Sequence, residues 1–165
     1  MNATLTELPF GFPGRIYRSP MPYGNYDPQD AVLDLYGQAG IKVVVMLVSF
    51  EEAWQKTGLD LRCLYRDLGM QVIYLPIPDF DIPFAADLLS GLSQVQAEAL
   101  AGRAVAVHCN AGVGRTGLFM ACLARKVFGM TGKQAVAWVQ QYIAHAVETE
   151  SQFSFVEELD LGQAI

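Results

Sequence analysis

The sequence AVAVHCNAGVGRTG, residues 104–117, joins a short apolar run to a loop that contains three glycines. An apolar run that ends in such a loop predicts a strand leading into a helix. The last six residues spell G-x-G-x-x-G, the pattern of dinucleotide-binding loops. The same stretch places Cys109 six positions before Arg115, on either side of a glycine-rich turn. Two kinds of phosphate chemistry therefore compete for this loop.

The dinucleotide interpretation makes demands that the following sequence does not meet. It requires a second strand that ends in an acidic residue roughly 20 positions after the glycines. Residues 137–142, AWVQQY, lie there instead, with a helical pattern and no carboxylate, and only 48 residues follow Gly117. The mononucleotide pattern G-x-x-x-x-G-K-[ST] is absent because the loop has no lysine. We therefore set both nucleotide interpretations aside.

Strand and helix patterns alternate on both sides of this loop. Residues 15–18, 41–48, 71–75 and 103–107 have the β-branched or apolar character of strands. We expect the first helix to have Asp27 as its N-cap and Pro28 as its first residue, and to end at Gly37 or Gly40. Further helices are expected at residues 51–56, 60–68, 84–100 and from 116 onward. The alternation predicts an α/β fold: one domain, residues 1–165, with a central, mostly parallel sheet of four to five strands flanked by helices.

Composition narrows the function classes. A chain of 165 residues with 52% hydrophobic and 17% charged residues is typical of one compact globule. The net charge of −6 opposes binding to nucleic acid or to an anionic membrane. No apolar run is long enough to cross a bilayer, and the N-terminal MNATLTELPF has no basic region, so we expect a cytoplasmic location. Three scattered cysteines and two histidines argue against a structural zinc site.

The cysteine interpretation fits the loop's physical properties. Backbone N–H groups between a strand end and a helix start form a cradle for a tetrahedral oxyanion. Gly112 and Gly114 permit the backbone angles and close approach that such a cradle needs. Arg115 can grip two phosphate oxygens, and the amide dipoles favour the thiolate form of Cys109. We also expect the Thr116 hydroxyl to hydrogen-bond the sulfur.

The stretch HCNAGVGRTG resembles the H-C-x-x-G-x-x-R-[ST] signature of the cysteine-dependent protein tyrosine and dual-specificity phosphatases. The resemblance implies Cys109 as nucleophile, Arg115 as phosphate clamp, Thr116 as an aid to the leaving thiolate and His108 as the residue that orients the cysteine. It also implies a phosphocysteine intermediate and no metal or other cofactor. The phosphate cradle would be formed by the backbone of Asn110, Ala111, Gly112, Val113, Gly114 and Arg115.

A second segment, LPIPDFDIP at residues 75–83, resembles the P-I-x-D-x-x-x-P loop of the branch that contains cyclin-dependent-kinase-associated phosphatases. That register selects Asp79 as the general acid and leaves Asp81 as the alternative. A third segment, AVETESQFSFV at residues 146–156, resembles the A-[VI]-x-T-x-x-Q-x-x-[FY] segment of the family. The resemblance implies that Gln152 places the hydrolytic water, while a helix-start role in packing is the alternative.

These resemblances predict a metal-independent phosphatase that acts on phosphoproteins as a monomer. No segment resembles a phosphotyrosine-recognition loop, which favours dual specificity over phosphotyrosine alone, with Tyr23 and Tyr26 at the rim of the cleft. A catalytically inactive phosphate-binding module and a rhodanese-like or arsenate-reducing enzyme are the alternatives. We expect Glu51 and Glu52 to start a solvated helix rather than to support Arg115, and Cys63 and Cys122 to be packed in the interior, with a disulfide to Cys109 left open.

Overall fold

The computed structural model describes residues 4–162 and contains a five-stranded sheet in the order β1-β2-β5-β3-β4. The strands are β1 (Thr6–Leu8), β2 (Ile16–Ser19), β3 (Ile41–Met46), β4 (Gln71–Tyr74) and β5 (Ala104–His108). The β1–β2 pair is antiparallel, and the other three pairs are parallel. The predicted α/β fold with a mostly parallel sheet is confirmed. β1, a three-residue edge strand, was not predicted from the sequence.

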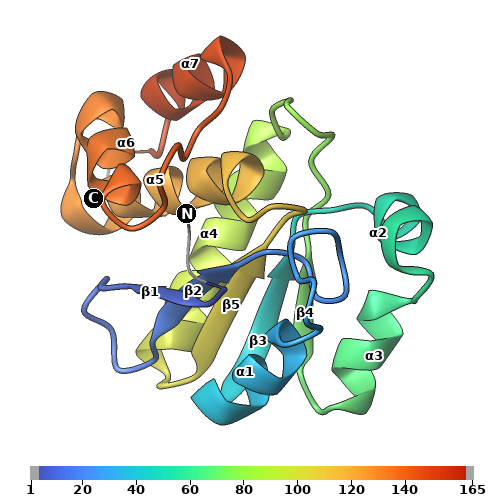
Figure 1. Ribbon diagram of the computed structural model, residues 1–165. Coiled ribbons are helices and arrows are strands. Elements are labelled where there is room, and N and C mark those ends of the chain that lie inside the picture. The colour runs from blue at the N-terminus through green and yellow to red at the C-terminus, as the bar shows by residue number, and fades with distance from the viewer. Residues whose placement is uncertain (1–3, 163–165) are drawn as a thin grey trace.

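Helices cover both faces of the sheet (Figure 1). From β2 the chain moves outward to β3 and β4 through α1 (Val32–Ala39), α2 (Phe50–Thr57) and α3 (Leu61–Asp67). It then returns to the centre, to β5, through α4 (Ala85–Leu100). Because parallel crossovers are right-handed, this change of direction places α4 on the opposite face from the first three helices. The final helices, α5 (Gly114–Phe128), α6 (Gly132–Gln140) and α7 (Glu150–Glu158), pack together, with α5 against α4.

The start of α1 corrects a sequence prediction. The helix begins at Val32 rather than at Pro28, because Asp30 has a φ of 53° and interrupts helical geometry. Asp27 still acts on the helix start. Its buried carboxylate accepts hydrogen bonds from the backbone N–H groups of Ala31 and Val32, at 2.8 and 3.3 Å. The helix ends at Gly40, which has the left-handed conformation that favours glycine, as predicted.

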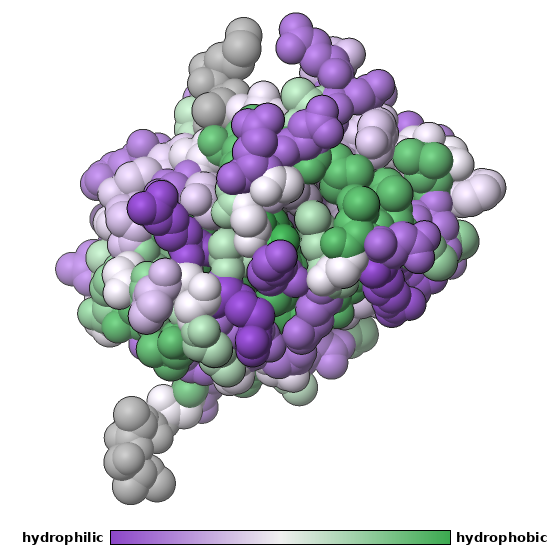
Figure 2. All heavy atoms as spheres, turned by 90° about the horizontal axis from the view of Figure 1, so that it is seen from below, coloured by the Kyte–Doolittle hydropathy of each residue, from purple (hydrophilic) through white to green (hydrophobic). Residues whose placement is uncertain are grey.

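The centre of the sheet is apolar on both faces. Val43, Val44 and Val45 of β3 and Val105 and Val107 of β5 are fully buried, as expected for parallel strands covered by helices. On the face shown in Figure 2, hydrophobic residues form separate groups among hydrophilic ones. No helix within the described residues has the length and hydropathy to cross a bilayer.

Candidate active site

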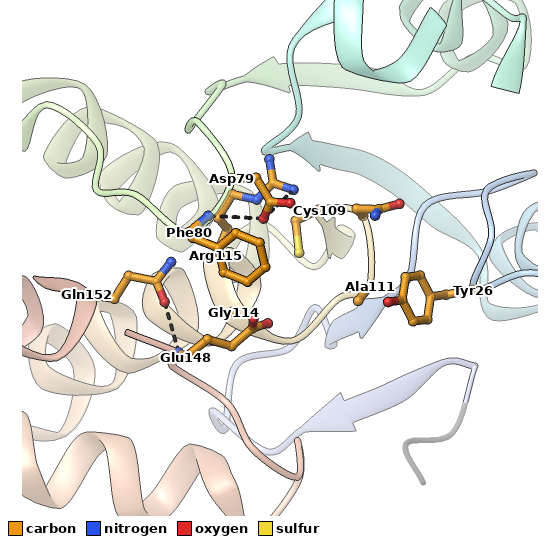
Figure 3. A pocket seen from close by; sticks show the side chains of 10 residues that line it. Tyr26, Asp79, Phe80, Cys109, Ala111, Gly114, Arg115, Glu148 and Gln152 are labelled. Atoms are coloured by element: carbon orange, nitrogen blue, oxygen red, sulfur yellow. Dashed lines mark hydrogen bonds and ion pairs between the residues drawn. The ribbon is translucent and has the colours of Figure 1, made fainter. Parts of the chain in front are cut away.

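The loop between β5 and α5 lies at the carboxyl end of the central strand. β5 is bonded to β2 on one side and to β3 on the other, so the ends of three strands meet here. This is the edge at which open parallel sheets bind ligands. A pocket of about 370 Å³, part of it open to solvent, lies at this edge (Figure 3). Its lining includes Cys109, Asn110, Ala111, Gly114, Arg115, Asp79, Phe80, Tyr26, Glu148 and Gln152.

The loop carbonyls are held away from the pocket. Arg18, at the end of β2, is buried and donates to Ala111 O at 2.9 Å and to Gly112 O at 3.0 Å. Met21 N–H donates to Asn110 O at 2.9 Å. In a trans peptide the N–H of the next residue points opposite to the C=O. The N–H groups of Ala111, Gly112 and Val113 therefore point to the side of the loop opposite Arg18 and Met21, as an oxyanion cradle requires. Of these three residues only Ala111 is in the pocket lining, while the Gly112 N–H donates to the Cys109 sulfur.

Gly112 is required by this arrangement. Its φ is +74°, and an added Cβ would lie 2.2 Å from Arg18 Nη2 and 2.3 Å from Ser19 O. A side chain here would displace the arginine that supports the cradle. The predicted role of Gly112 therefore has a physical basis in both backbone angle and space.

Cys109 lies at the base of the pocket with only 2% of its surface exposed. The N–H of Gly112 donates to its Sγ at 3.2 Å. The first N–H groups of α5 also have no acceptor within the helix, so the positive end of its dipole is directed to the same place. Both features place hydrogen-bond donors and the positive end of the helix dipole at the sulfur.

The expected hydrogen bond from Thr116 to the sulfur is not formed. Thr116 is buried on α5 and its Oγ1 has no hydrogen-bond partner among the described residues. Thr116 lies in the first turn of α5, and the hydrogen bond that the sulfur accepts comes from the Gly112 backbone N–H instead. The predicted role of Thr116 in catalysis is therefore not supported by a hydrogen bond from its hydroxyl to the Cys109 sulfur.

Arg115 is buried and fixed by Glu52, which was expected from the sequence to be solvated. Its Nη1 and Nη2 donate to Glu52 Oε1 and Oε2, both at 2.9 Å, and Nη1 also donates to Ile77 O at 2.9 Å. Burial lowers the pKa of this guanidinium, but the bonds to Glu52 and the charges of Cys109 and Asp79 outweigh it, so the pKa is raised overall. Glu51 is exposed and takes no part. The expectation for Glu52 was wrong, since the start of α2 after β3 lies beside the loop.

Of the two candidate acids, Asp79 is at the site. Its carboxylate lines the pocket and lies 3.3 Å from Arg115 Nη2, with its side chain 44% exposed. The Asp81 carboxylate accepts from Ile82 N–H at 2.8 Å and is not part of the pocket lining. Between them, Phe80 has a left-handed φ of 60°, which turns consecutive side chains in different directions.

The Gln152 side chain has a structural role that joins two site segments. It is fully buried at the third position of α7 and completes a capping box with Thr149. Its Oε1 accepts from Glu148 N–H at 2.9 Å, while Nε2 donates to Asp81 O at 3.2 Å. Thr149 Oγ1 also donates to Phe80 O at 3.4 Å. The start of α7 thus holds the aspartate loop, and Gln152 reaches the pocket from the same position.

His108 is a buried support for Cys109. Its Nδ1 lies 2.9 Å from Cys109 O and its Nε2 lies 2.8 Å from the Tyr65 hydroxyl. Burial lowers the pKa of His108 to about 4, so the ring is neutral near pH 7. A neutral ring satisfies both contacts when Nδ1–H donates to the carbonyl and Nε2 accepts from Tyr65. Tyr65, on α3, was not anticipated from the sequence.

This buried histidine predicts a pH dependence of stability. In the unfolded chain His108 becomes protonated below its ordinary pKa of 6.5, whereas in the folded protein it stays neutral until about pH 4. Stability is therefore lost as the pH falls from 7 to 5, by about 2 kcal/mol from this residue. Urea unfolding at both pH values should give a smaller loss for His108→Gln than for the wild type. His145→Gln, which changes the other, exposed histidine, is the control. Equal losses in all three proteins would contradict the assignment.

Other predicted positions differ in outcome. Tyr26 lines the pocket and is 57% exposed, whereas Tyr23 does not line it.

Cys122 is buried as expected, and burial raises the pKa of its thiol to about 12. Cys63 is exposed on α3, contrary to expectation, and donates to Asp60 at 3.3 Å. All three cysteines are free.

The pocket at the end of the central strand is lined by backbone amides and by a buried cysteine and arginine. This arrangement is that of a protein tyrosine phosphatase-type domain. The chain belongs to the polymorphic toxin system, DSP-PTPase phosphatase family, whose family model matches residues 22–127. The family resemblance predicted from the sequence is confirmed.

Two relatives match parts of the chain. An uncharacterized protein of Methanocaldococcus jannaschii is 31% identical over 113 residues, 67% of this chain and 73% of that protein. The human dual specificity protein phosphatase CDC14C is 51% identical over 37 residues, which are 22% of this chain. The chain spans only 8% of that relative's length.

Solved structures share the fold over nearly the whole chain. Kinase associated phosphatase, with its catalytic site cysteine replaced by serine, gives a TM-score of 0.84 at 18% identity and covers 96% of this chain and 94% of its own. Tk-PTP in its active form gives 0.78 at 26% identity, with 96% and 97% covered.

Proposed function

We propose that this domain is a phosphoprotein phosphatase that hydrolyses phosphomonoesters through a phosphocysteine at Cys109. The observation that carries the proposal is the position of the Cys109 thiol, at the base of an anion pocket and under the Gly112 N–H. Membership of a DSP-PTPase family supports it. We further propose that the enzyme acts on phosphotyrosine and on phosphoserine or phosphothreonine, as a monomer without a metal ion, and not on nucleic acid or membranes. The cytoplasmic location stays a prediction.

In the first step the Cys109 thiolate attacks phosphorus, an S–P bond forms and the ester P–O bond breaks. The loop amides and Arg115 stabilise the charge on the phosphoryl oxygens. The departing oxygen takes a proton from Asp79. In the second step water attacks phosphorus, Asp79 accepts its proton, the S–P bond breaks and inorganic phosphate leaves.

The contacts of Arg115 indicate how a bound substrate would release Asp79 for its role as general acid. A guanidinium has five N–H groups. The two on Nη1 face Glu52 and Ile77 O, and the two on Nη2 face Glu52 and Asp79. A phosphate held by two N–H groups needs Nε together with the Nη2 position now beside Asp79. We infer that the phosphate displaces Asp79 from Arg115 and that the carboxyl then turns to the leaving group.

Phosphate release from p-nitrophenyl phosphate in the presence of EDTA tests the reaction. We expect turnover to be unchanged by the chelator, because the proposed chemistry uses only protein groups. Activity that disappears with EDTA and returns with a divalent metal would contradict the mechanism. Tight phosphopeptide binding without turnover would indicate the inactive binding module instead.

Exchange of the two aspartates separates their roles. Asp79→Ala is expected to lower kcat on a phosphoserine peptide by about 10²-fold, the usual contribution of a general acid. On p-nitrophenyl phosphate the loss should be smaller, because that leaving group needs less protonation. Asp81→Ala is the matched control, since the Asp81 contact to Gln152 uses the backbone carbonyl. A larger effect for Asp81, or equal losses on both substrates, would reject Asp79 as the acid.

A further inference from the structure

One ionisable group at the mouth of the pocket has no part in the mechanism above. Glu148 lies in the segment before α7, and its side chain extends toward Gly114 at the start of α5 (Figure 3). A Cβ on Gly114 would be 2.7 Å from Glu148 Oε1 and 2.8 Å from its Cδ. The carboxylate therefore lies directly over the last glycine of the cradle, in space that the absence of a side chain leaves open.

The charge of Glu148 is not neutralised within the described part of the chain, where its carboxylate has no hydrogen bond or ion pair within contact distance. The residue is exposed. Arg115 is already paired with Glu52 and Asp79. Among residues 4–162, the pocket lining has one cationic side chain, Arg115, and two carboxylates, Asp79 and Glu148. A phosphate in this pocket would be held by backbone amides and Arg115, next to the unpaired negative charge of Glu148.

Glu148 also lines a second groove that continues from the phosphate pocket. This groove shares Tyr26, Ala111 and Glu148 with the pocket and extends past His145 and Gln140. Its volume is about 1010 Å³, including space open to solvent. Residues of a substrate next to the phosphorylated one would enter it. Among the described residues that line this groove, Glu148 is the only one with a carboxylate.

We propose that Glu148 sets the substrate class of this site: phosphoproteins with lysine or arginine next to the phosphorylated residue. A cation in the groove pairs with the Glu148 carboxylate, while an acidic residue or a second phosphate is repelled by it. The proposal rests on the proposed phosphatase function and goes beyond it by assigning the flanking preference to one side chain.

Three phosphotyrosine peptides, identical except for lysine, alanine or glutamate on both sides of the phosphotyrosine, test the proposal. For the wild type at low ionic strength we expect kcat/KM to be about three- to fivefold higher with lysine than with glutamate, as for a partly exposed ion pair. Glu148→Gln should bring this ratio close to one, and Glu148→Lys should reverse it. Added salt should weaken the preference of the wild type.

Glu150→Gln is the matched control, because it removes the same charge two residues away from an exposed side chain that lines neither pocket. We expect it to keep the wild-type ratio. A structural role for Glu148 would change all peptides equally and leave the ratio unchanged. An unchanged ratio in Glu148→Gln, or an equal shift in Glu150→Gln, overturns the proposal.

Binding distinguishes this proposal from the proposed function. Fluorescence anisotropy gives the dissociation constants of the same peptides for Cys109→Ser and for Cys109→Ser combined with Glu148→Gln, without turnover. A preference for lysine that the second substitution removes supports the role of Glu148 even if p-nitrophenyl phosphate is not hydrolysed. Hydrolysis of p-nitrophenyl phosphate with no peptide preference rejects the role of Glu148 and leaves the phosphatase function intact.

Discussion

Replacing Cys109 with serine is expected to lower kcat on p-nitrophenyl phosphate by at least about 10³-fold, or about 4 kcal/mol in activation free energy. The serine oxygen stays protonated near neutral pH, so the amide of Gly112 would face a neutral hydroxyl instead of a sulfur anion. Volume and burial change little, and the fold should persist. Initial rates with matched far-UV circular dichroism spectra measure the effect.

Cys63→Ser serves as the control, since Cys63 is exposed on α3. It should retain wild-type kcat. The intermediate is tested by rapid acid quench of the wild type followed by peptide mass spectrometry, in which the peptide containing Cys109 should gain the mass of one phosphoryl group. Substantial activity in Cys109→Ser, or a phosphoryl group on another residue, would contradict the mechanism.

Replacing Arg115 with lysine should lower kcat by about 10²- to 10³-fold although the positive charge is kept. The guanidinium bonds both Glu52 oxygens and Ile77 O at once and still has Nε for phosphate. An ammonium has no planar fork and cannot make these contacts together. Because the largely buried Glu52 carboxylate would lose hydrogen bonds, we also expect a lower melting temperature.

Arg125→Lys is the matched control on the same helix. Arg125 Nη1 donates to Val156 O and Leu159 O at 2.8 Å, away from the pocket. This variant should lose stability but keep kcat. If Arg115→Lys retained more than about a tenth of the wild-type kcat, the planar fork would not be needed for phosphate stabilisation.

Much of the site was predictable because its chemistry is local in sequence. Residues 104–117 contain the strand end, the turn and the helix start that set the spacing between Cys109 and Arg115. The α4 bounds were also close to prediction, because a long apolar periodicity outweighs neighbouring effects. Short elements were harder. β1 is a three-residue edge strand that pairs with β2, and α1 starts late because of one left-handed residue.

The sequence alone determined the α/β class, through the alternation of strand and helix patterns along the chain. It also predicted the proposed nucleophile with its arginine, and the segment that carries the proposed acid, from patterns within a few residues of one another. The tertiary structure alone decided which distant groups support them: Arg18 lies 94 residues before Gly112, Glu52 lies 63 before Arg115, and Tyr65 lies 43 before His108. Their contacts depend on strand order β2-β5-β3 and on the helices that follow β3. A buried arginine or histidine must find a hydrogen-bonding partner, but only the folded chain determines which residue is close enough to be that partner.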